Sequence, residues 1–499
     1  MKRSHRPEPK KQGAKQAPSK KPSARGTKRT GPASRDDARG ARTGPASRDD
    51  ARGARTERAS RPLREDLVLQ ACLEAYGSVR HEGRLSDRAL DFTLRRKAHL
   101  YSTERRAVAE RVYALLRRQR TVDWLLARVR PGFDRLETTR QDVMRLAASR
   151  ILHGEPLEQV VHSSSLPSED GAALRTLPDA AAALDALPPA KRYPIAASLP
   201  DFLAEKFLET FGADANAAAE AMNERAPLTA RVNLLKGSRE ELQRRLAAEG
   251  VESTPTPLSP LGLWLETRVN VFSLQCFKDG LLELQDEGSQ LLGMLVDSPP
   301  TRVVDACAGA GGKTLQLAAQ MKNRGDLHAL DVDEVRIEEL RKRARRAGVH
   351  NVRTQVIPAE DPAAAEALVA LKDKADRVMV DAPCSGTGTY RRKPDGRYRL
   401  TPEDLKAQAA RQKALLERFS TMVKPGGRLI YGTCSVLREE NEAVIDDFLS
   451  RHPEFSVRPV SQELGPELGE KVSRGPFLRL APHTHNTDGF FGAILVRAK

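Results

Sequence analysis

The sequence predicts an α/β fold with an open parallel sheet, preceded by an all-α part, a small α+β segment and a disordered basic tail. Two observations predict the sheet. Short apolar, β-branched runs at residues 302–305, 375–380 and 427–431 are bounded by turn residues, as is typical of buried parallel strands. The first run is followed by a glycine-rich turn and by an apolar-periodic stretch, 315–321, which together predict a strand–turn–helix unit.

Residues 1–63 are expected to form the tail. The first 60 residues contain no Phe, Trp or Tyr, and their 18 Lys and Arg against 6 Asp and Glu give +12 of the formal net charge of +16. Such a segment cannot bury enough apolar surface to offset the entropy of ordering. Residues 29–41 recur unchanged as 42–54, a copy shorter than the periods of folded repeats. The charge favours sequence-independent contact with a nucleic acid, and the alternative is an inert solubilising extension.

Residues 64–187 are predicted to be helical. Apolar residues recur at helical spacing in two stripes, the second in a helix expected to begin with Ser102 or Thr103 as its cap. The stripes are Val68, Cys72, Leu73 and Tyr76, and Val108, Val112, Leu115 and Leu116. Residues 168–171 and the alanine-rich stretch 177–187 are expected to form a connection. In the α+β segment, residues 188–284, a strand is predicted at 229–235 and a helix with a capping box at 238–249.

A glycine-rich loop follows the strand that ends at Asp305. Its sequence, Cys-Ala-Gly-Ala-Gly-Gly-Lys-Thr over residues 307–314, lets the backbone approach a nucleotide cofactor closely. A phosphate-binding loop would need glycine at the first of these positions, where this chain has cysteine. The next predicted strand, 326–330, is followed by Asp331 and Asp333, and an acid at this place can bind ribose hydroxyls. Asp331 is the better candidate because it directly follows the strand.

Two cysteines each close a predicted strand. Cys384 lies in Asp-Ala-Pro-Cys-Ser-Gly-Thr-Gly, residues 381–388, and Cys434 lies in Tyr-Gly-Thr-Cys-Ser, residues 431–435. If the two strands are neighbours, they lie about 4.8 Å apart, and both thiols face one pocket at the carboxyl ends of the sheet. Five cysteines, an odd number with three in such motifs, indicate a reducing compartment and not a disulfide framework.

The three cysteine-bearing motifs, in this order, resemble those of the RsmB/Fmu/Sun family of S-adenosylmethionine-dependent RNA cytosine-5 methyltransferases. The resemblance extends over roughly residues 190–499 and includes 282–290 and 488–491. It implies a Rossmann-like methyltransferase domain at 285–499 and a small RNA-binding α+β segment at 188–284. Residues 102–117 resemble the NusB-like RNA-binding domain of the RsmB branch, which implies such a domain at 64–187. The chain departs from the family at Gly309-Ala310, where Ala-Pro is usual, and at Gly432, where Ser is usual.

The resemblance also implies roles for individual residues. Cys434 would attack the base, Cys384 would assist its release, and Asp381 would hold the pyrimidine edge. S-adenosylmethionine would be held by the loop, Asp331, Asp381 and an acid after the third strand. That acid is Glu360 or Asp361, with Asp361 as the working choice. The loop residues are Cys307, Ala308, Gly309, Ala310, Gly311, Gly312 and Lys313. The Cys307 thiol is expected to serve packing.

The expected function is therefore an RNA cytosine-5 methyltransferase acting on 16S ribosomal RNA. Transfer RNA is the alternative substrate, and a catalytically silent RNA-binding protein is an alternative class. A nicotinamide dehydrogenase would explain the glycine-rich turn and Asp331, but it gives no role to the cysteine pair. Two basic clusters, 341–346 and 391–393, are candidate phosphate contacts, against the alternative of a solvated helix face for the first.

Metal and membrane are not expected. The cysteines form no Cys-x-x-Cys, and His483 and His485, without further ligands nearby, are expected to be loop residues. No stretch of 18 or more apolar residues occurs, and no apolar segment follows the charges of the amino terminus. We therefore expect a cytoplasmic protein, and a monomer.

Deletion of residues 1–60 should weaken RNA binding mainly at low salt and flatten its dependence on salt. The reason is that the segment carries charge but no aromatic side chain that could stack on bases. Binding measured across a salt series checks the first part. The methylated position and the single-turnover rate on saturating RNA should not change. A shifted target nucleotide would show that the tail takes part in recognition.

Overall fold

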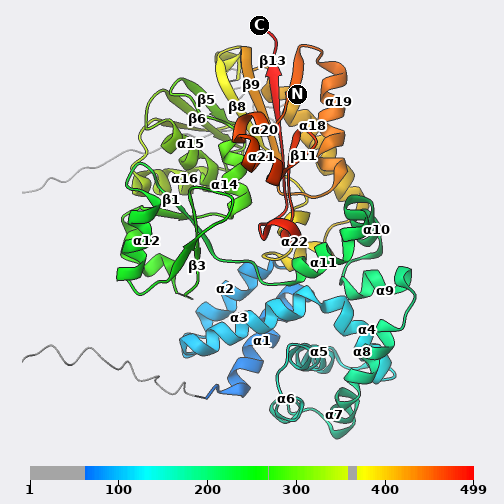
Figure 1. Cartoon of the computed structure of the whole chain (residues 1–499). Helices are drawn as coiled ribbons and strands as arrows, with labels where there is room; N and C mark the ends of the chain where they lie inside the picture. The colour runs from blue at the N-terminus through cyan, green and yellow to red at the C-terminus, as the bar shows by residue number, and fades with distance from the viewer. Residues whose placement is uncertain (1–61, 268, 358–367) are drawn as a thin grey trace, which may run out of the picture. The chain divides into compact units, whose positions relative to one another are not determined.

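The computed structural model describes residues 62–267, 269–357 and 368–499, so the predicted tail lies almost wholly outside the described residues. The first described part is helical and encloses one hydrophobic core, which includes both predicted stripes (Figure 1). Its helices are α1 (Glu65–Arg80), α2 (Ser86–Arg96), α3 (Ser102–Arg117), α4 (Gln119–Val129), α5 (Thr138–Leu152), α6 (Leu157–Ser163), α7 (Ser168–Arg175) and α8 (Leu177–Asp185). The resemblance of this part to NusB-like domains stays a prediction.

Two expectations about the helical part were wrong. The alanine-rich stretch is not a connection but the helix α8, because alanine is the strongest helix former and Ala180 and Leu184 are buried. Residues 168–171 likewise begin α7. Neither predicted cap holds the start of α3. The carboxylate of Glu104 accepts the backbone N–H of Tyr101 at 2.8 Å instead.

Between residues 189 and 284, the described residues form five α-helices and a four-stranded antiparallel sheet, in the order β2-β3-β1-β4. The elements are α9 (Pro189–Ala196), α10 (Asp201–Phe211), α11 (Ala215–Asn223), β1 (Thr229–Val232), α12 (Arg239–Ala248), β2 (Ser253–Pro255), β3 (Gly262–Leu265), α13 (Gln275–Lys278) and β4 (Leu282–Leu284). The strand β1 is shorter than predicted because Asn233 turns the chain and donates to the carbonyls of Gly280 and Ala347, both at 2.8 Å. Ser238 caps α12 as predicted, accepting the N–H of Glu241.

The last part is a nine-stranded mixed sheet with helices on both faces. Its main path is β11-β12-β13-β9-β8-β5-β6-β7, and β10 pairs with β13. The strands are β5 (Arg302–Asp305), β6 (Asp326–Asp331), β7 (Val352–Val356), β8 (Ala375–Asp381), β9 (Val423–Thr433), β10 (Phe455–Arg458), β11 (Ser473–Arg474), β12 (Phe477–Leu480) and β13 (Phe490–Arg497). Pairing from β7 through β9 is parallel, whereas β13 pairs with its neighbours antiparallel.

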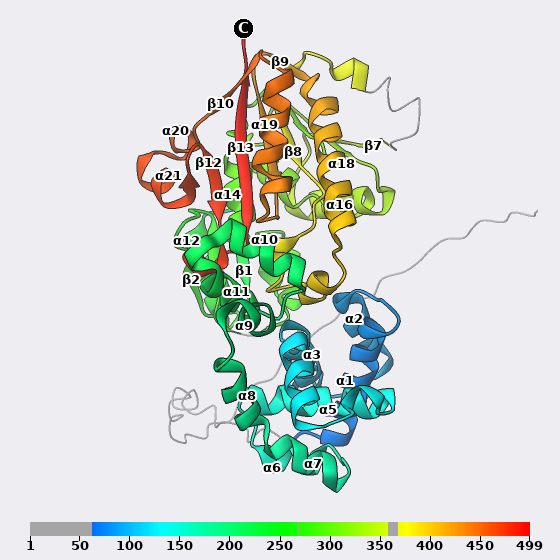
Figure 2. The ribbon, with the colours of Figure 1, turned by 90° about the vertical axis from the view of Figure 1, so that its right-hand side faces the viewer.

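Helices cover the two faces of this sheet in separate groups. One core joins the sheet to α14 (Glu287–Met294), α15 (Gly312–Gln320) and α16 (Glu334–Ala347), and the other joins it to α18 (Pro402–Ser420) and α19 (Glu442–Arg451). Figures 1 and 2 show the two groups on opposite sides of the strands. The remaining short helices are α20 (Ser461–Leu464), α21 (Pro466–Val472) and α22 (Pro482–His485). No helix in the described part of the chain is long and apolar enough to cross a membrane.

The strand order indicates where in the sheet the candidate site lies. The order along the sheet reverses between β5 and β8, and ligands of open α/β sheets bind at the carboxyl ends of the strands beside such a reversal. Asp305, Asp331 and Asp381 end β5, β6 and β8 at this edge. Gly432, beside Asp381 in the β8–β9 ladder, has no room for a side chain, because a Cβ there would lie 2.5 Å from Leu292. Leu292 thus occupies the space that the usual Ser side chain would need.

Buried polar contacts join the helical part to the segment that follows Cys384, and residues 62–499 form one compact unit. Arg397 is fully buried, and its Nη1 donates to the side chain of Asn223 at 2.6 Å and to the carbonyl of Arg117 at 3.1 Å. The hydroxyl of Ser86, at the start of α2, donates to Asp395 at 2.5 Å. The chain downstream of Cys384 is therefore fixed against α2, α3 and α11.

Candidate active site

The structure brings Cys384 and Cys434 together. Cys384 follows β8, Cys434 follows β9, and the two strands are parallel neighbours. Their sulfur atoms lie 3.3 Å apart, a hydrogen-bond contact and not a disulfide. Both residues are half-buried, so a substrate can reach them from the edge of the sheet.

The two thiols differ in their surroundings. The hydrogen bond to Cys434, burial and the nearby carboxylate of Glu440 together raise the pKa of Cys384 well above its ordinary value. Cys384 therefore keeps its proton and can donate it in the S–H···S contact. A thiolate is the nucleophilic form of cysteine, so this environment suits Cys434 for attack and Cys384 for a protonated partner.

Glu440 supports the Cys384 loop and was missed by the sequence analysis. It is fully buried, and its Oε1 accepts from the backbone N–H of Ser385 at 2.8 Å and from the amide of Gln412 at 2.9 Å. Its Oε2 accepts from the Ser385 hydroxyl, and the Gln412 amide also donates to the carbonyl of Pro383 at 3.0 Å. Glutamate is usually exposed, so nothing in Arg438-Glu-Glu440 distinguishes the buried carboxylate from its neighbour.

Asp381 and Lys313 form an ion pair between the two halves of the site. The Nζ of Lys313 donates to Oδ2 of Asp381 at 2.7 Å, and the Asp381 side chain remains 29% exposed. Lys313 comes from the first turn of α15 and lies 5.6 Å from the centre of the Phe490 ring. The pair thus connects the glycine-rich loop to the strand that carries Cys384.

The glycine-rich loop has the shape of a nucleotide-binding turn. Gly309 and Gly311 adopt positive φ angles of 53° and 88°. At Gly311 a side chain would also collide with Leu340, 2.6 Å away. A Cβ at Gly309 or Gly312 would meet nothing within 4 Å, so the backbone is open to a ligand there. The residues present therefore fit a nucleotide-like cofactor.

The structure separates the two acids that follow β6. Oδ2 of Asp331 accepts the N–H of Gly309 at 2.7 Å, which places this carboxylate beside the glycine-rich loop. Each carboxylate oxygen can accept a second bond, so Asp331 can also hold a hydroxyl. Asp333 instead caps α16 by accepting the N–H groups of Val335 and Arg336. Glu360 and Asp361 lie outside the described residues.

Two buried groups lie beneath the loop. Asp305 accepts from the Thr314 hydroxyl through Oδ2 at 2.7 Å, whereas its Oδ1 has no partner among the described residues. Burial, with Asp381 and Asp331 nearby, raises the pKa of Asp305 to about 7. The same causes, burial first, raise the pKa of Cys307, whose side chain packs against the core. Cys307 therefore stays protonated, in agreement with the expected packing role.

Most of the basic cluster on α16 stabilises the fold. Arg343 and Arg346 both pair with Glu283, the former at 2.9 Å, and Arg341 donates to Thr354 at 2.8 Å. These side chains are already engaged by acceptors within the chain. A phosphate contact is therefore not supported for these three arginines, whereas Lys342 and Arg345 are exposed.

The cluster 391–393 divides in a similar way. Arg391 is buried, and Arg392 pairs with Asp286 at 2.9 Å and with Asp488 at 2.7 Å. Lys393 is exposed. The structure therefore gives Arg392 an architectural role, leaves Lys393 accessible, and leaves Nε and Nη1 of Arg391 without a partner among the described residues.

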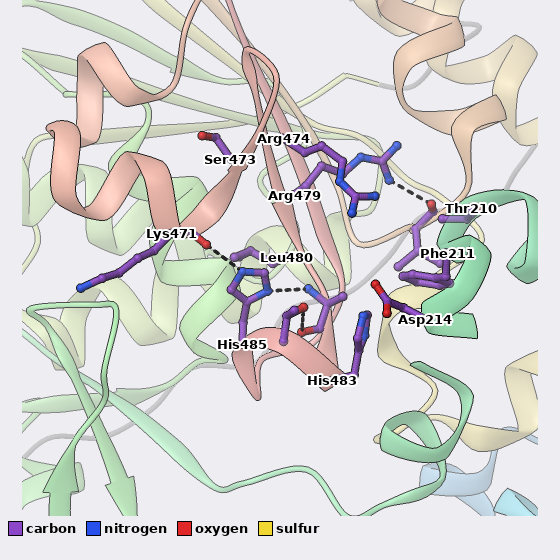
Figure 3. A pocket seen from close by; sticks show the side chains of 13 residues that line it. Thr210, Phe211, Asp214, Lys471, Ser473, Arg474, Arg479, Leu480, His483 and His485 are labelled. Atoms are coloured by element: carbon purple, nitrogen blue, oxygen red, sulfur yellow. Dashed lines mark hydrogen bonds between the residues drawn. The ribbon is translucent and has the colours of Figure 1, made fainter. Parts of the chain in front are cut away.

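His483 and His485 lie on α22 and not in a loop, which corrects the expectation. They line a pocket of about 200 Å³ between α22 and the turn after α10 (Figure 3). The His485 ring accepts from the N–H of Ala481 at 3.1 Å and contacts the carbonyl of Lys471 at 3.0 Å. Across residues 62–267, 269–357 and 368–499, no group of three or more His, Cys, Asp or Glu is arranged to hold a metal ion.

Comparison with known proteins identifies the family. A model described as 16S rRNA methyltransferase RsmB/F matches residues 294–496, and a ferredoxin-like domain model of RsmF/B-like methyltransferases matches residues 199–272. A probable ribosomal RNA small subunit methyltransferase B of Bacillus subtilis (strain 168) is 30% identical over 411 residues, which span 79% of this chain and 90% of that protein. The chain belongs to the RsmB/F methyltransferase family.

Further relatives agree with this membership. The ribosomal RNA small subunit methyltransferase B of Thermus thermophilus is 33% identical, over 77% of this chain and 87% of that protein. A solved structure described as "Crystal Structure of PH0851" is 27% identical, covers 88% of this chain and 99% of its own, and has a TM-score of 0.70. The predicted Rossmann-like methyltransferase fold is confirmed. Membership supports an RNA methyltransferase and leaves the dehydrogenase alternative without support.

Replacement of Glu440 by Gln should lower the pH at which Cys384 becomes reactive, because the variant removes the negative charge that helps to raise the pKa of this thiol. The rate of alkylation of Cys384, followed by peptide mass spectrometry over a pH series in a Cys434→Ser background, measures the shift. Glu439→Gln is the matched control, since Glu439 pairs with Lys206 at 2.9 Å away from the loop. Equal profiles for both variants would contradict the role of Glu440.

Proposed function

We propose that the protein methylates carbon 5 of a cytosine in 16S ribosomal RNA through a covalent intermediate on Cys434. The observation that carries the proposal is the 3.3 Å contact between the Cys384 and Cys434 sulfurs at the ends of neighbouring strands. The names of the relatives, small-subunit ribosomal RNA methyltransferases, support the choice of RNA. A monomeric state and a cytoplasmic location stay predictions.

The chemistry explains why a thiol pair suits this reaction. Carbon 5 of cytosine is a poor nucleophile in the neutral ring. A thiolate that adds to carbon 6 forms a C–S bond and makes carbon 5 enamine-like, so that it can take a methyl group. Loss of the carbon-5 proton to a base and expulsion of the thiolate then restore the ring. Cysteine suits both steps because thiolate is a strong nucleophile and a good leaving group.

In the proposed reaction, each of three residues has its own role. Cys434 forms and later breaks the bond to carbon 6. Cys384 holds its proton 3.3 Å away, where its S–H stabilises the negative sulfur of Cys434 before attack and again at release. Asp381, fixed by Lys313, lies at the same edge and contacts the pyrimidine as charge builds on the ring.

The glycine-rich loop supports S-adenosylmethionine as the methyl donor. When bound, this cofactor supplies an electrophilic methyl group. The open backbone at Gly309 and Gly312 gives the loop room for such a ligand, and the carboxylate of Asp331 is placed for its ribose hydroxyls. Lys313 extends from this loop to Asp381, so cofactor and base would meet above the ends of β5 and β8.

Replacement of each cysteine by alanine in turn tests which thiol attacks the base and which assists its release. Cys434→Ala should abolish methyl transfer and retain cofactor binding, because this thiol acts on the base. Cys384→Ala should instead accumulate a covalent RNA–protein adduct, since release from Cys434 is impaired. Denaturing electrophoresis with labelled RNA detects the adduct. An adduct in Cys434→Ala and none in Cys384→Ala would show that the two thiols have the opposite roles. Methyl transfer and product release that are unchanged in both variants would reject the proposal.

Replacement of Asp331 by Ala should weaken S-adenosylmethionine binding by roughly 1–3 kcal/mol, the cost of leaving buried hydroxyls without a charged partner. Isothermal titration calorimetry measures the affinity. Asp333→Ala is the control: it removes the cap of α16, at a cost of about 0.5–2 kcal/mol in stability, and should leave the affinity unchanged. An unchanged affinity for Asp331→Ala would place the ribose contact elsewhere.

A further inference from the structure

A groove lined by arginines lies between α3 and the segment that follows the Cys384 loop. Its volume is about 470 Å³, within the range of about 300–1,000 Å³ that is usual for ligand sites. Its lining comes from three parts of the chain: Arg106, Tyr113 and Arg117 of α3, the connection 225–228, and Arg391 with Arg392. A second hollow of about 380 Å³ shares Arg106 and 225–228 and continues to Leu265 at the end of β3. We call the two together the arginine groove.

Three arginines of the groove form no ion pair within the described residues. Arg106 is exposed on α3. Arg117 donates only to a carbonyl, that of Arg391, at 2.9 Å. Arg391 is buried, its Nη2 donates to the side-chain oxygen of Asn486 at 2.9 Å, and its Nε and Nη1 have no partner among the described residues. Arg343 of α16 and Arg392 beside the groove, by contrast, bind carboxylates.

Among the described residues, the acidic groups around the groove form no ion pair with these three arginines. Glu110 pairs with Arg225 at 3.1 Å, and Asp286 and Asp488 both pair with Arg392. Glu224 is exposed, as is Glu266 in the second hollow, which accepts from the hydroxyl of Thr254 at 2.8 Å. Burial and the neighbouring cations Arg397 and Arg225 lower the pKa of Arg117 to about 10. A bound anion would favour the charged form of Arg117 and so offset these effects.

The groove also offers a surface for a base. Tyr113 lies in its wall, and the Arg117 guanidinium is 5.6 Å from the centre of that ring. Single-stranded RNA is bound by the combination of cationic side chains for phosphates and aromatic rings for unstacked bases. The lining therefore fits a nucleotide strand better than a lone phosphate.

A series of hydrogen bonds connects the groove to both cysteine loops. Arg392 holds Asp488, and the N–H of the next residue, Gly489, donates to the carbonyl of Gly388 at 2.8 Å. The N–H of Gly388 in turn donates to the carbonyl of Cys434 at 2.9 Å. A strand bound in the groove would thus be held in a fixed position relative to the two thiols.

We propose that the arginine groove binds the phosphate–ribose backbone of the RNA strand beside the target nucleotide, with Arg106, Arg117 and Arg391 as phosphate contacts and Tyr113 as a stacking surface. The proposal rests on RNA as the substrate. It assigns the helical part a direct role in substrate positioning, through α3. The groove contacts backbone and base faces, so it positions the strand without selecting its sequence.

The test compares Arg106→Gln with Arg128→Gln in the full-length protein. Both side chains are exposed and without an ion pair among the described residues, but Arg128 lies on α4 outside the groove. Binding of deproteinised 16S ribosomal RNA is measured over a salt series. Arg106→Gln should bind about five- to tenfold more weakly at moderate salt and lower the slope of log K against log salt by about 0.7–0.9, one phosphate contact. Arg106→Lys should restore most of both values.

Arg128→Gln should leave both values, and the single-turnover rate on saturating RNA, unchanged. Equal losses in Arg106→Gln and Arg128→Gln, or an unchanged slope in Arg106→Gln, would overturn the groove as a phosphate site. If the variants give such a result and the wild-type protein methylates the RNA, only the groove is rejected. A wild-type protein that does not methylate any RNA would reject the proposed function instead.

Discussion

The parallel pairing of β8 with β9 is the constraint on which the site depends. The ladder runs to Asp381 opposite Gly432, so both strands end at the same level and release Cys384 and Cys434 on the same side. β9 cannot shift to another edge, because β13 pairs with it antiparallel on its other side. Leu292 fills the space over Gly432 and joins α14 to the strand. Backbone hydrogen bonds and core packing thus bring the starts of the two cysteine-bearing segments to the same place.

Strand pairing alone does not fix the loop that carries Cys384. Buried charged side chains hold this loop in addition. Glu440 binds the start of the loop, and Arg392 binds Asp286 and Asp488 farther along. Burial and the nearby Asp286 raise the pKa of Asp488 to about 7 despite Arg392. Buried charges are costly to desolvate and cost more when one partner is lost, so such a network favours one arrangement of the loop. Arg397 extends the same network to α3 and α11.

The sequence predicted what depends on neighbours in the chain. The strands at 302–305 and 375–380, the glycine-rich turn and the capped α12 follow from local pattern, and they were found. The carbonyl contacts of Asn233, which end β1, join residues far apart in the chain and have no local signal. The same holds for Glu440 and Arg392, whose burial is set by tertiary packing. Asp331 and Asp333 show the limit of what the sequence can predict. The place of Asp331 directly after the strand favoured it, but only the hydrogen bonds in the structure, to Gly309 for Asp331 and to the start of α16 for Asp333, separate their roles.

Charge has different meanings in different parts of this chain. The first 60 residues account for +12 of the net +16, so the remaining chain carries only +4. A nearly neutral body can still bind a polyanion if its charges are distributed unevenly, because screening limits each charge to about 10 Å at ordinary salt. Ion pairs engage Arg343 and Arg346 of one apparent basic patch on α16, whereas folding brings Arg106 and Arg117 of α3 beside Arg391 from the run 391–393, a combination that the sequence alone does not reveal. The partner of an arginine, and not the number of arginines, therefore decides where the RNA can bind.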